Sequence, residues 1–244
     1  MSLLTKIKDR VYASRAEDFP KKIVFTKREY LSILFIPLIF LNSYIFSWIL
    51  SDKESLAVAD ALFRGLLFIL IVILYFPLLK LHWSKFKQGK WFSYMLVILG
   101  AIVLQIVISI TQSLLPASEN SSSVDKSTEL VVNGTVFLIS FTPLFTALIE
   151  DFVFRYTLLH KLFVPNKVWR LTLILLNSIL FGLVHYNNFE GNILATTTFM
   201  SAGLFLNLIY IWTRNIWHVL LIHTLNNFVL STVGLLVFWL LKSL

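Results

Sequence analysis

The stretch Leu66-Leu-Phe-Ile-Leu-Ile-Val-Ile-Leu74 is an unbroken apolar run inside a longer apolar segment at 58–79. A helix needs about 20 mostly apolar residues to cross the hydrocarbon layer of a membrane. Segment 58–79 is long enough for that, and a surface helix of a soluble protein would instead show a polar face. The stretch therefore predicts a membrane-spanning helix.

The whole chain has the composition of a protein with many such segments. Of its 244 residues, 57% are hydrophobic and 14% are charged, and the mean hydropathy is +0.80. Soluble domains are typically about 45–50% apolar and about 25% charged, so this chain has too few charges to cover a soluble fold. There is no cysteine, which excludes disulfides, thiolate metal sites and a cysteine nucleophile. A disordered chain, a disulfide scaffold and an ordinary cytosolic enzyme are all excluded.

Six further segments resemble 58–79 in length and polarity. We predict an all-α fold, a polytopic bundle of transmembrane helices with seven spans at about 30–50, 58–79, 92–115, 130–160, 168–186, 193–212 and 215–241. The fourth segment is too long for the bilayer alone, so its charged C-terminal end is expected to project into water. The seventh could break at Gly234, which would make eight spans.

The positions of lysine and arginine predict how the chain is oriented. Seventeen of the 21 lie in the N-terminal arm or in the connections after the second, fourth and sixth segments. Cytoplasmic connections are enriched in these residues, so we predict a cytoplasmic N-terminus in a multi-pass protein of the cell membrane. The net charge of +8 then indicates orientation in a lipid bilayer, with no nucleic acid as a partner. Residues 1–29 form a basic cytoplasmic arm, and residues 30–244 form one transmembrane bundle whose candidate catalytic core is at about 130–230.

Few polar side chains fall within the first three predicted spans. A charged side chain in the hydrocarbon costs at least about 2.5–3.5 kcal/mol, so each one needs a partner or a function. Asn42 and Gln105 are single polar residues, which we interpret as contacts between helices. Asp60 and Arg64 are four residues apart and share a helix face, which favours a structural ion pair.

The fourth predicted span contains two adjacent acids in the stretch Leu148-Ile-Glu-Asp-Phe-Val-Phe-Arg155. Asp151 and Arg155 are four residues apart and are expected to form an ion pair along the helix. Glu150 points about 100° away from Asp151 and has no cation nearby in the sequence. A carboxylate in an apolar setting suits general acid–base chemistry near neutral pH. The alternative is that Glu150 only bonds to a neighbouring helix.

Three more candidate site residues lie in the fifth and seventh spans. The fifth ends in Phe181-Gly-Leu-Val-His185, where Gly182 permits another helix to come close. A histidine at a helix end is more often structural, so His185 alone indicates little. His223 and Asn227 are four residues apart in the seventh span and share a face.

The helical rise places these groups at comparable depths. At 1.5 Å per residue, Glu150 and His185 both lie about 25 Å from the turn that joins their helices. His223 lies about 15 Å from the turn before its own helix. The depths agree if the charged hairpin 155–170 projects about 10 Å beyond the membrane. These three side chains and Asn227 are then expected to converge inside the bundle.

In order and spacing, these residues resemble the CPBP family, the CAAX proteases and bacteriocin-processing enzymes, also called the Abi family of intramembrane endopeptidases. Its pattern is Glu-Glu-x-x-x-Arg, then Phe-x-x-x-His, then His-x-x-x-Asn or Asp. The matching stretches, within about residues 130–230, are Glu150-Asp151-x-x-x-Arg155, Phe181-x-x-x-His185 and His223-x-x-x-Asn227. Asp151 and Arg155 would support the site. Asp151 replaces the second Glu, which is a mild change if this position only pairs with Arg155 and a serious one if it binds water or metal.

The resemblance implies a role for the other four side chains. Glu150 would activate water with help from His185, and His223 and Asn227 would stabilise the oxyanion of a tetrahedral intermediate. The family was long described as metalloproteases, and Glu150, His185 and His223 could ligate zinc. We predict the metal-free mechanism, without a cofactor, because the chain has no His-Glu-x-x-His helix and Asn227 suits an oxyanion better than a metal.

The predicted function is therefore that of a hydrolase, an intramembrane endopeptidase. Its substrate would be a membrane-associated protein or peptide precursor, and prenylated CAAX proteins, bacteriocin leaders and signalling peptides are all consistent with the resemblance. The alternative is a non-catalytic membrane immunity or regulatory protein on the same scaffold. A transporter is disfavoured because the chain shows no internal repeat.

Overall fold

The computed structural model describes residues 2–115, 134–189 and 191–242, which form helices and short connections without a β-strand. The elements in chain order are α1 (Leu3–Ser14), α2 (Lys27–Ile33), α3 (Phe35–Ile49), α4 (Lys53–Leu74), α5 (Phe76–Gln88), α6 (Trp91–Leu114), α7 (Gly134–Ile139), α8 (Thr142–Asp151), the π-helical η1 (Phe152–His160), α9 (Lys167–Leu183), the 3-10 turn η2 (Tyr186–Phe189), α10 (Ile193–Thr213), α11 (Ile216–Phe228), the π-helical η3 (Val229–Val233) and α12 (Gly234–Lys242). The predicted all-α class is confirmed.

Six helical runs in the described ranges are long and apolar enough to cross a membrane. They are Lys27–Ile49, Lys53–Leu74, Trp91–Leu114, Gly134–His160, Ile193–Thr213 and Ile216–Lys242. The predicted span 168–186 corresponds to α9, which is shorter, with 17 residues. Residues 130–133 of the predicted fourth span lie outside the described part, and the helix is continuous through Gly234. The polytopic bundle is thus borne out, while the number of spans and the side of the N-terminus stay predictions.

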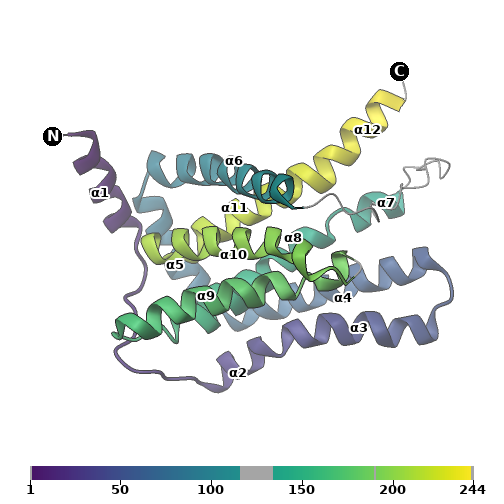
Figure 1. Cartoon of the computed structure of the whole chain (residues 1–244), viewed down its shortest axis with the longest axis horizontal. Coiled ribbons are helices and arrows are strands. Elements are labelled where there is room, and N and C mark those ends of the chain that lie inside the picture. The colour runs from purple at the N-terminus through teal and green to yellow at the C-terminus, as the bar shows by residue number, and fades with distance from the viewer. Residues whose placement is uncertain (1, 116–133, 190, 243–244) are drawn as a thin grey trace.

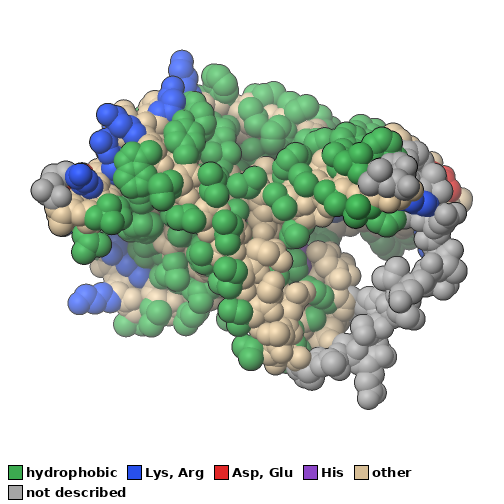
Figure 2. All heavy atoms as spheres, turned by 90° about the horizontal axis from the view of Figure 1, so that it is seen from above, with side chains coloured by type: hydrophobic (Ala, Val, Ile, Leu, Met, Phe, Trp, Pro, Cys, Tyr) green, Lys and Arg blue, Asp and Glu red, His purple; other side chains and the backbone are tan. Residues whose placement is uncertain are grey.

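The exterior of the bundle is apolar. Large side chains such as Trp48, Leu62 and Ile73 are exposed on α3 and α4. Figure 2 shows hydrophobic side chains over much of one face, with lysine and arginine gathered mainly at one end. So large an apolar surface belongs in lipid, and the charge at one end is typical of a bundle with a fixed orientation.

The helices that carry the predicted site pack against one another in the middle of the molecule. α9 and α10 lie side by side across the centre of Figure 1, with α3 and α4 along one side and α6 on the other. α8 contacts both α4 and α11, and α11 also packs against α6. Side chains on α8, on α11 and at the end of α9 can therefore meet in one interior region.

The contact between α9 and α10 depends on glycine, as the sequence predicted for Gly182. A Cβ at Gly182 would lie 2.8 Å from the backbone nitrogen of Met200 and 2.8 Å from the carbonyl oxygen of Thr196. Backbone atoms cannot move aside as a flexible side chain can, so the two helices approach this closely only because residue 182 has no Cβ.

Gly182→Ala is therefore expected to lower the free energy of unfolding by about 1–3 kcal/mol, because overpacking forces the two helices apart. Thermal unfolding of the detergent-solubilised protein, followed by circular dichroism, measures the effect. Gly134→Ala is the matched control, since a Cβ there meets no atom within 4 Å. Equal unfolding temperatures for the two variants would show that the close approach at Gly182 is not required.

The charged end of the fourth span does not project into water, contrary to the sequence prediction. η1 continues α8 into the protein interior, where Arg155 is fully buried and His160 is nearly so. Only the tip of the hairpin is exposed, around Asn166. The prediction was wrong because it treated the segment as an isolated helix, whereas the N-terminal arm folds back over it and places Glu17 Oε2 3.6 Å from His160 Nε2.

The N-terminal arm is held on the bundle by hydrogen bonds. The amide of Ala16 donates to the carbonyl of Arg214 at 3.2 Å. The side-chain amide of Asn215 donates to the carbonyl oxygens of Ser14 and His82, each at 2.8 Å. Burial lowers the pKa of His82 to about 4, so this ring is neutral and its Nδ1 accepts a backbone hydrogen bond. Part of the arm is thus packed structure and covers one end of the bundle.

Candidate active site

The fourth span is interrupted on both sides of the segment that carries the two acids. α7 ends at Ile139 and α8 begins at Thr142, with Pro143 in its first turn. Proline lacks the N–H that would continue a helix, which explains why the helix is interrupted just before Pro143. On the other side α8 passes directly into the π-helical η1, and π-helical turns are frequent at functional sites. Glu150 and Asp151 are the last two residues of α8.

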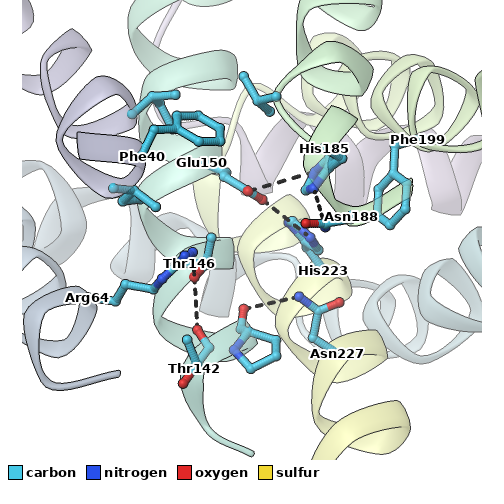
Figure 3. Close-up of a pocket in the computed structure, with 14 residues that line it drawn as sticks. Phe40, Arg64, Thr142, Thr146, Glu150, His185, Asn188, Phe199, His223 and Asn227 are labelled. Atoms are coloured by element: carbon cyan, nitrogen blue, oxygen red, sulfur yellow. Dashed lines mark hydrogen bonds and ion pairs between the residues drawn. The ribbon is translucent and has the colours of Figure 1, made fainter. Parts of the chain in front are cut away.

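The carboxylate of Glu150 lies between two imidazoles. Its Oε1 is 3.8 Å from His185 Nε2, and its Oε2 is 3.9 Å from His223 Nε2. Figure 3 shows the carboxylate pointing to both rings, which come from the end of α9 and from α11. Both separations exceed a direct hydrogen bond, so a water molecule could bond to an oxygen and a nitrogen at once. The predicted convergence of these three residues is present.

Asp151 joins the ion pair to the second imidazole. Its Oδ1 lies 3.4 Å from Arg155 Nη1, which is the pair that the spacing predicts. Its Oδ2 lies 3.3 Å from His223 Nδ1, a contact that the sequence analysis missed. The guanidinium of Arg155 also sits 4.0 Å from the centre of the Phe181 ring, so a cation–π contact supports the buried charge. The two adjacent acids therefore face different nitrogens of the His223 ring, Asp151 at Nδ1 and Glu150 at Nε2.

The imidazole of His185 is oriented by Asn188 and by two aromatic rings. Its Nδ1 lies 3.3 Å from the side-chain amide nitrogen of Asn188 in η2. An amide nitrogen only donates, so Nδ1 accepts and the ring proton is on Nε2, the atom that faces Glu150. The ring packs against Phe199 at 4.1 Å and Phe181 at 5.2 Å between ring centres. Asn188 was not predicted from the sequence, although it lies only three residues after His185.

Asn227 lies in the same cavity but points to a different partner. Its amide nitrogen donates to the carbonyl of Pro143 at 3.1 Å, as Figure 3 shows. The cavity has a volume of about 320 Å³. Its lining residues are Ile36, Ile39, Phe40, Arg64, Thr142, Pro143, Thr146, Glu150, Val184, His185, Asn188, Phe199, His223 and Asn227. All four predicted catalytic side chains therefore face one space.

Arg64, like Asn188, lines this cavity although the sequence did not predict that position. The predicted pair with Asp60 is present, with 2.8 Å between Arg64 Nε and Asp60 Oδ2. Arg64 also lines the cavity, where its Nη1 donates to Thr146 Oγ1 at 3.0 Å. Spacing alone identifies the partner on the same helix and not the cavity beyond it.

The described part of the chain has no group of three or more His, Asp or Glu residues arranged to hold a metal ion. The two imidazole nitrogens approach different oxygens of Glu150. The metal-free mechanism stays a prediction.

A polytopic helical bundle with a carboxylate between two imidazoles in an interior cavity defines a membrane protein with an acid–base site. Residues 132–229 match the family described as type II CAAX prenyl endopeptidase Rce1-like. The matched family is the CPBP family that the motifs indicated. The family is generally one of proteases, and all four predicted catalytic residues lie within the match. No curated protein and no solved structure matches the chain.

Proposed function

We propose that the protein is an intramembrane endopeptidase of the cell membrane that hydrolyses a peptide bond in a membrane-associated protein or peptide precursor. The observation that carries the proposal is the Glu150 carboxylate between His185 and His223 in a cavity of the bundle. A buried acid flanked by two imidazoles is costly in a membrane protein unless it has a function. The family match for residues 132–229 supports the same chemistry.

In the proposed mechanism Glu150 is the general base. Its carboxylate takes a proton from a water molecule, and the oxygen of that water attacks the carbonyl carbon of the scissile bond. The Nε2–H of His185 orients the carboxylate and the water. Glu150 then returns the proton to the nitrogen of the leaving amine as the C–N bond breaks, so the carboxylate is restored for the next cycle.

The developing oxyanion needs hydrogen-bond donors on the opposite side of the carbonyl. We propose that His223 Nε2 and the amide of Asn227 are these donors. Asp151 accepts from His223 Nδ1 and stabilises the doubly protonated ring, in which Nε2 carries a proton. Asn227 would exchange its bond to the Pro143 carbonyl for one to the substrate oxygen.

The test of the proposed function is a search for cleavage products that depend on Glu150. The full-length protein and its Glu150→Gln variant are expressed in matched cells, and new protein N-termini in the membrane fraction are compared by mass spectrometry. New N-termini that appear only with the unaltered protein are expected, and their formation by purified protein should resist 1,10-phenanthroline. Identical N-termini in both samples would contradict hydrolysis and favour the non-catalytic alternative. A prenylated CAAX peptide is a separate candidate substrate.

Asn188→Ala is expected to lower the turnover rate up to about tenfold, since a lost hydrogen bond of about 0.5–1.5 kcal/mol no longer holds the His185 proton on Nε2. Turnover of the identified substrate by purified protein measures this. Asn187→Ala is the matched control, because this neighbouring amide is exposed and does not line the cavity. Equal rates for both variants would mean that Asn188 does not position the imidazole.

A further inference from the structure

Arg64 is a positively charged group inside the cavity that the proposed mechanism does not use. It comes from α4, outside the part of the chain that matches the family. Its side chain is mostly buried and lines the same space as Glu150 and the two histidines. A buried arginine in a membrane protein is costly, so its position calls for a partner or a ligand.

The contacts of Arg64 hold the guanidinium in place and leave Nη2 free among the described residues. Nε binds Asp60 and Nη1 donates to Thr146, while Nη2 makes no hydrogen bond to any described residue. The Asp60 carboxylate also accepts from Asn42 Nδ2 at 3.0 Å and from Ser43 Oγ at 3.3 Å. These hydrogen bonds fix the position of Asp60 and, through the ion pair, that of the guanidinium.

A second donor without a partner lies at the same end of the cavity. Thr142 Oγ1 is buried and has no hydrogen-bond partner in the described structure. Thr142 lies one helical turn before Thr146, whose own hydroxyl donates to the Thr142 carbonyl at 2.9 Å, and Figure 3 shows both threonines beside Arg64. Arg64 Nη2 and Thr142 Oγ1 thus offer unused N–H and O–H groups to one ligand.

The distance from Arg64 and Thr146 to Glu150 allows one substrate to contact Arg64 and Glu150 at the same time. Thr146 and Glu150 are four residues apart on α8, so their Cβ atoms are about 5–6 Å apart. An extended peptide advances about 3.3–3.6 Å per residue. A group held by Arg64 is therefore only a few residues along the chain from a bond placed at Glu150.

We propose that Arg64 binds a carboxylate of the substrate and so determines which peptide bond reaches Glu150. The carboxylate is either the C-terminus of the chain or an Asp or Glu side chain, because both present the two oxygens that a guanidinium edge binds. This inference rests on the proposed endopeptidase function and adds a specificity-determining residue to it. A carbonyl or amide group would make a weaker hydrogen bond at the same place.

The test measures binding in the absence of cleavage, with full-length Glu150→Gln protein in lipid nanodiscs. Three probes are compared by isothermal titration calorimetry: acetyl-Val-Leu-Leu with a free carboxylate, the same peptide as its carboxamide, and acetyl-Val-Leu-Glu as its carboxamide. We expect one or both acidic probes to bind more tightly than the neutral one. Tighter binding of acetyl-Val-Leu-Leu with its free carboxylate identifies a chain terminus as the ligand. Tighter binding of acetyl-Val-Leu-Glu carboxamide identifies an acidic side chain as the ligand. Arg64→Gln is expected to weaken the preferred acidic probe by about 10–100-fold and to leave the neutral probe unchanged.

Two further variants separate recognition from a structural role. Arg64→Lys keeps the charge and should retain part of the preference for acid. Asp60→Asn breaks the same ion pair but keeps the Arg64 charge, so it should not weaken acidic probes. The proposal is overturned if no acidic probe is preferred, or if Arg64→Gln and Asp60→Asn weaken all probes alike. Glu150-dependent cleavage without an acid preference would reject the role of Arg64 alone, whereas an Arg64-dependent preference without any cleavage would reject the protease function alone.

Discussion

Glu150→Gln is expected to lower the rate of peptide cleavage by about 10²–10⁴-fold, the usual contribution of a general base. Glutamine has nearly the same size, but its amide does not accept a proton from water. The packing around the residue should therefore change little while the chemistry is lost. The rate is measured with purified protein in liposomes on the substrate that the N-terminal mapping identifies.

Glu54→Gln is the matched control for this variant, because Glu54 is an exposed acid in the first turn of α4. It removes the same charge far from the cavity and should leave the rate unchanged. Both variants should unfold at nearly the same temperature as the unaltered protein. If Glu150→Gln retained most of its activity, another group would have to be the base.

Arg155→Met is expected to have the largest effect on stability, a loss of about 3–5 kcal/mol in the free energy of unfolding. Arg155 and Asp151 are both fully buried, and removing one partner leaves an uncompensated charge in the interior. The loss is measured from the unfolding of the purified protein in detergent with increasing denaturant. His223 should also lose part of its fixed orientation, because Arg155 no longer holds the Asp151 carboxylate in place beside Nδ1.

The double variant Asp151→Leu with Arg155→Met separates stability from chemistry. Replacing a whole buried ion pair by apolar residues is often neutral, so the double variant should recover most of the stability that Arg155→Met loses. It should stay inactive, because His223 has lost the carboxylate at Nδ1. A double variant as unstable as the single one would show that the pair itself is not the source of the instability.

The substitution of Asp for Glu at position 151 now has a structural context. The sequence left open whether residue 151 only pairs with Arg155. The shorter side chain reaches Arg155 and His223 at once, at 3.4 Å and 3.3 Å. The contact with His223 makes residue 151 a positioning residue for the proposed oxyanion donor, so the choice of acid here affects the chemistry and the stability together.

What the sequence by itself determined depends on properties of short segments. Apolar runs of membrane length predict helices because a bilayer satisfies no backbone polar groups. The four-residue spacings of Asp60 with Arg64 and of Asp151 with Arg155 predict pairs on one helix face. The approximate depths of Glu150 and its two histidines follow from the rise per residue. None of these inferences requires knowing which helices are neighbours.

Only the tertiary structure decided the contacts between segments far apart in the chain. The burial of Arg155 and His160, the contact of Asp151 with His223 and the place of Arg64 in the cavity all depend on which helices pack together and how each is rotated. Sequence spacing specifies the angle between side chains on one helix. It does not specify how the helix is rotated about its axis relative to its neighbours. For that reason the helices and most of the candidate site could be predicted from the sequence. The contacts that Asp151 and Asn188 make with the two histidines, and the position of Arg64 in the cavity, could not.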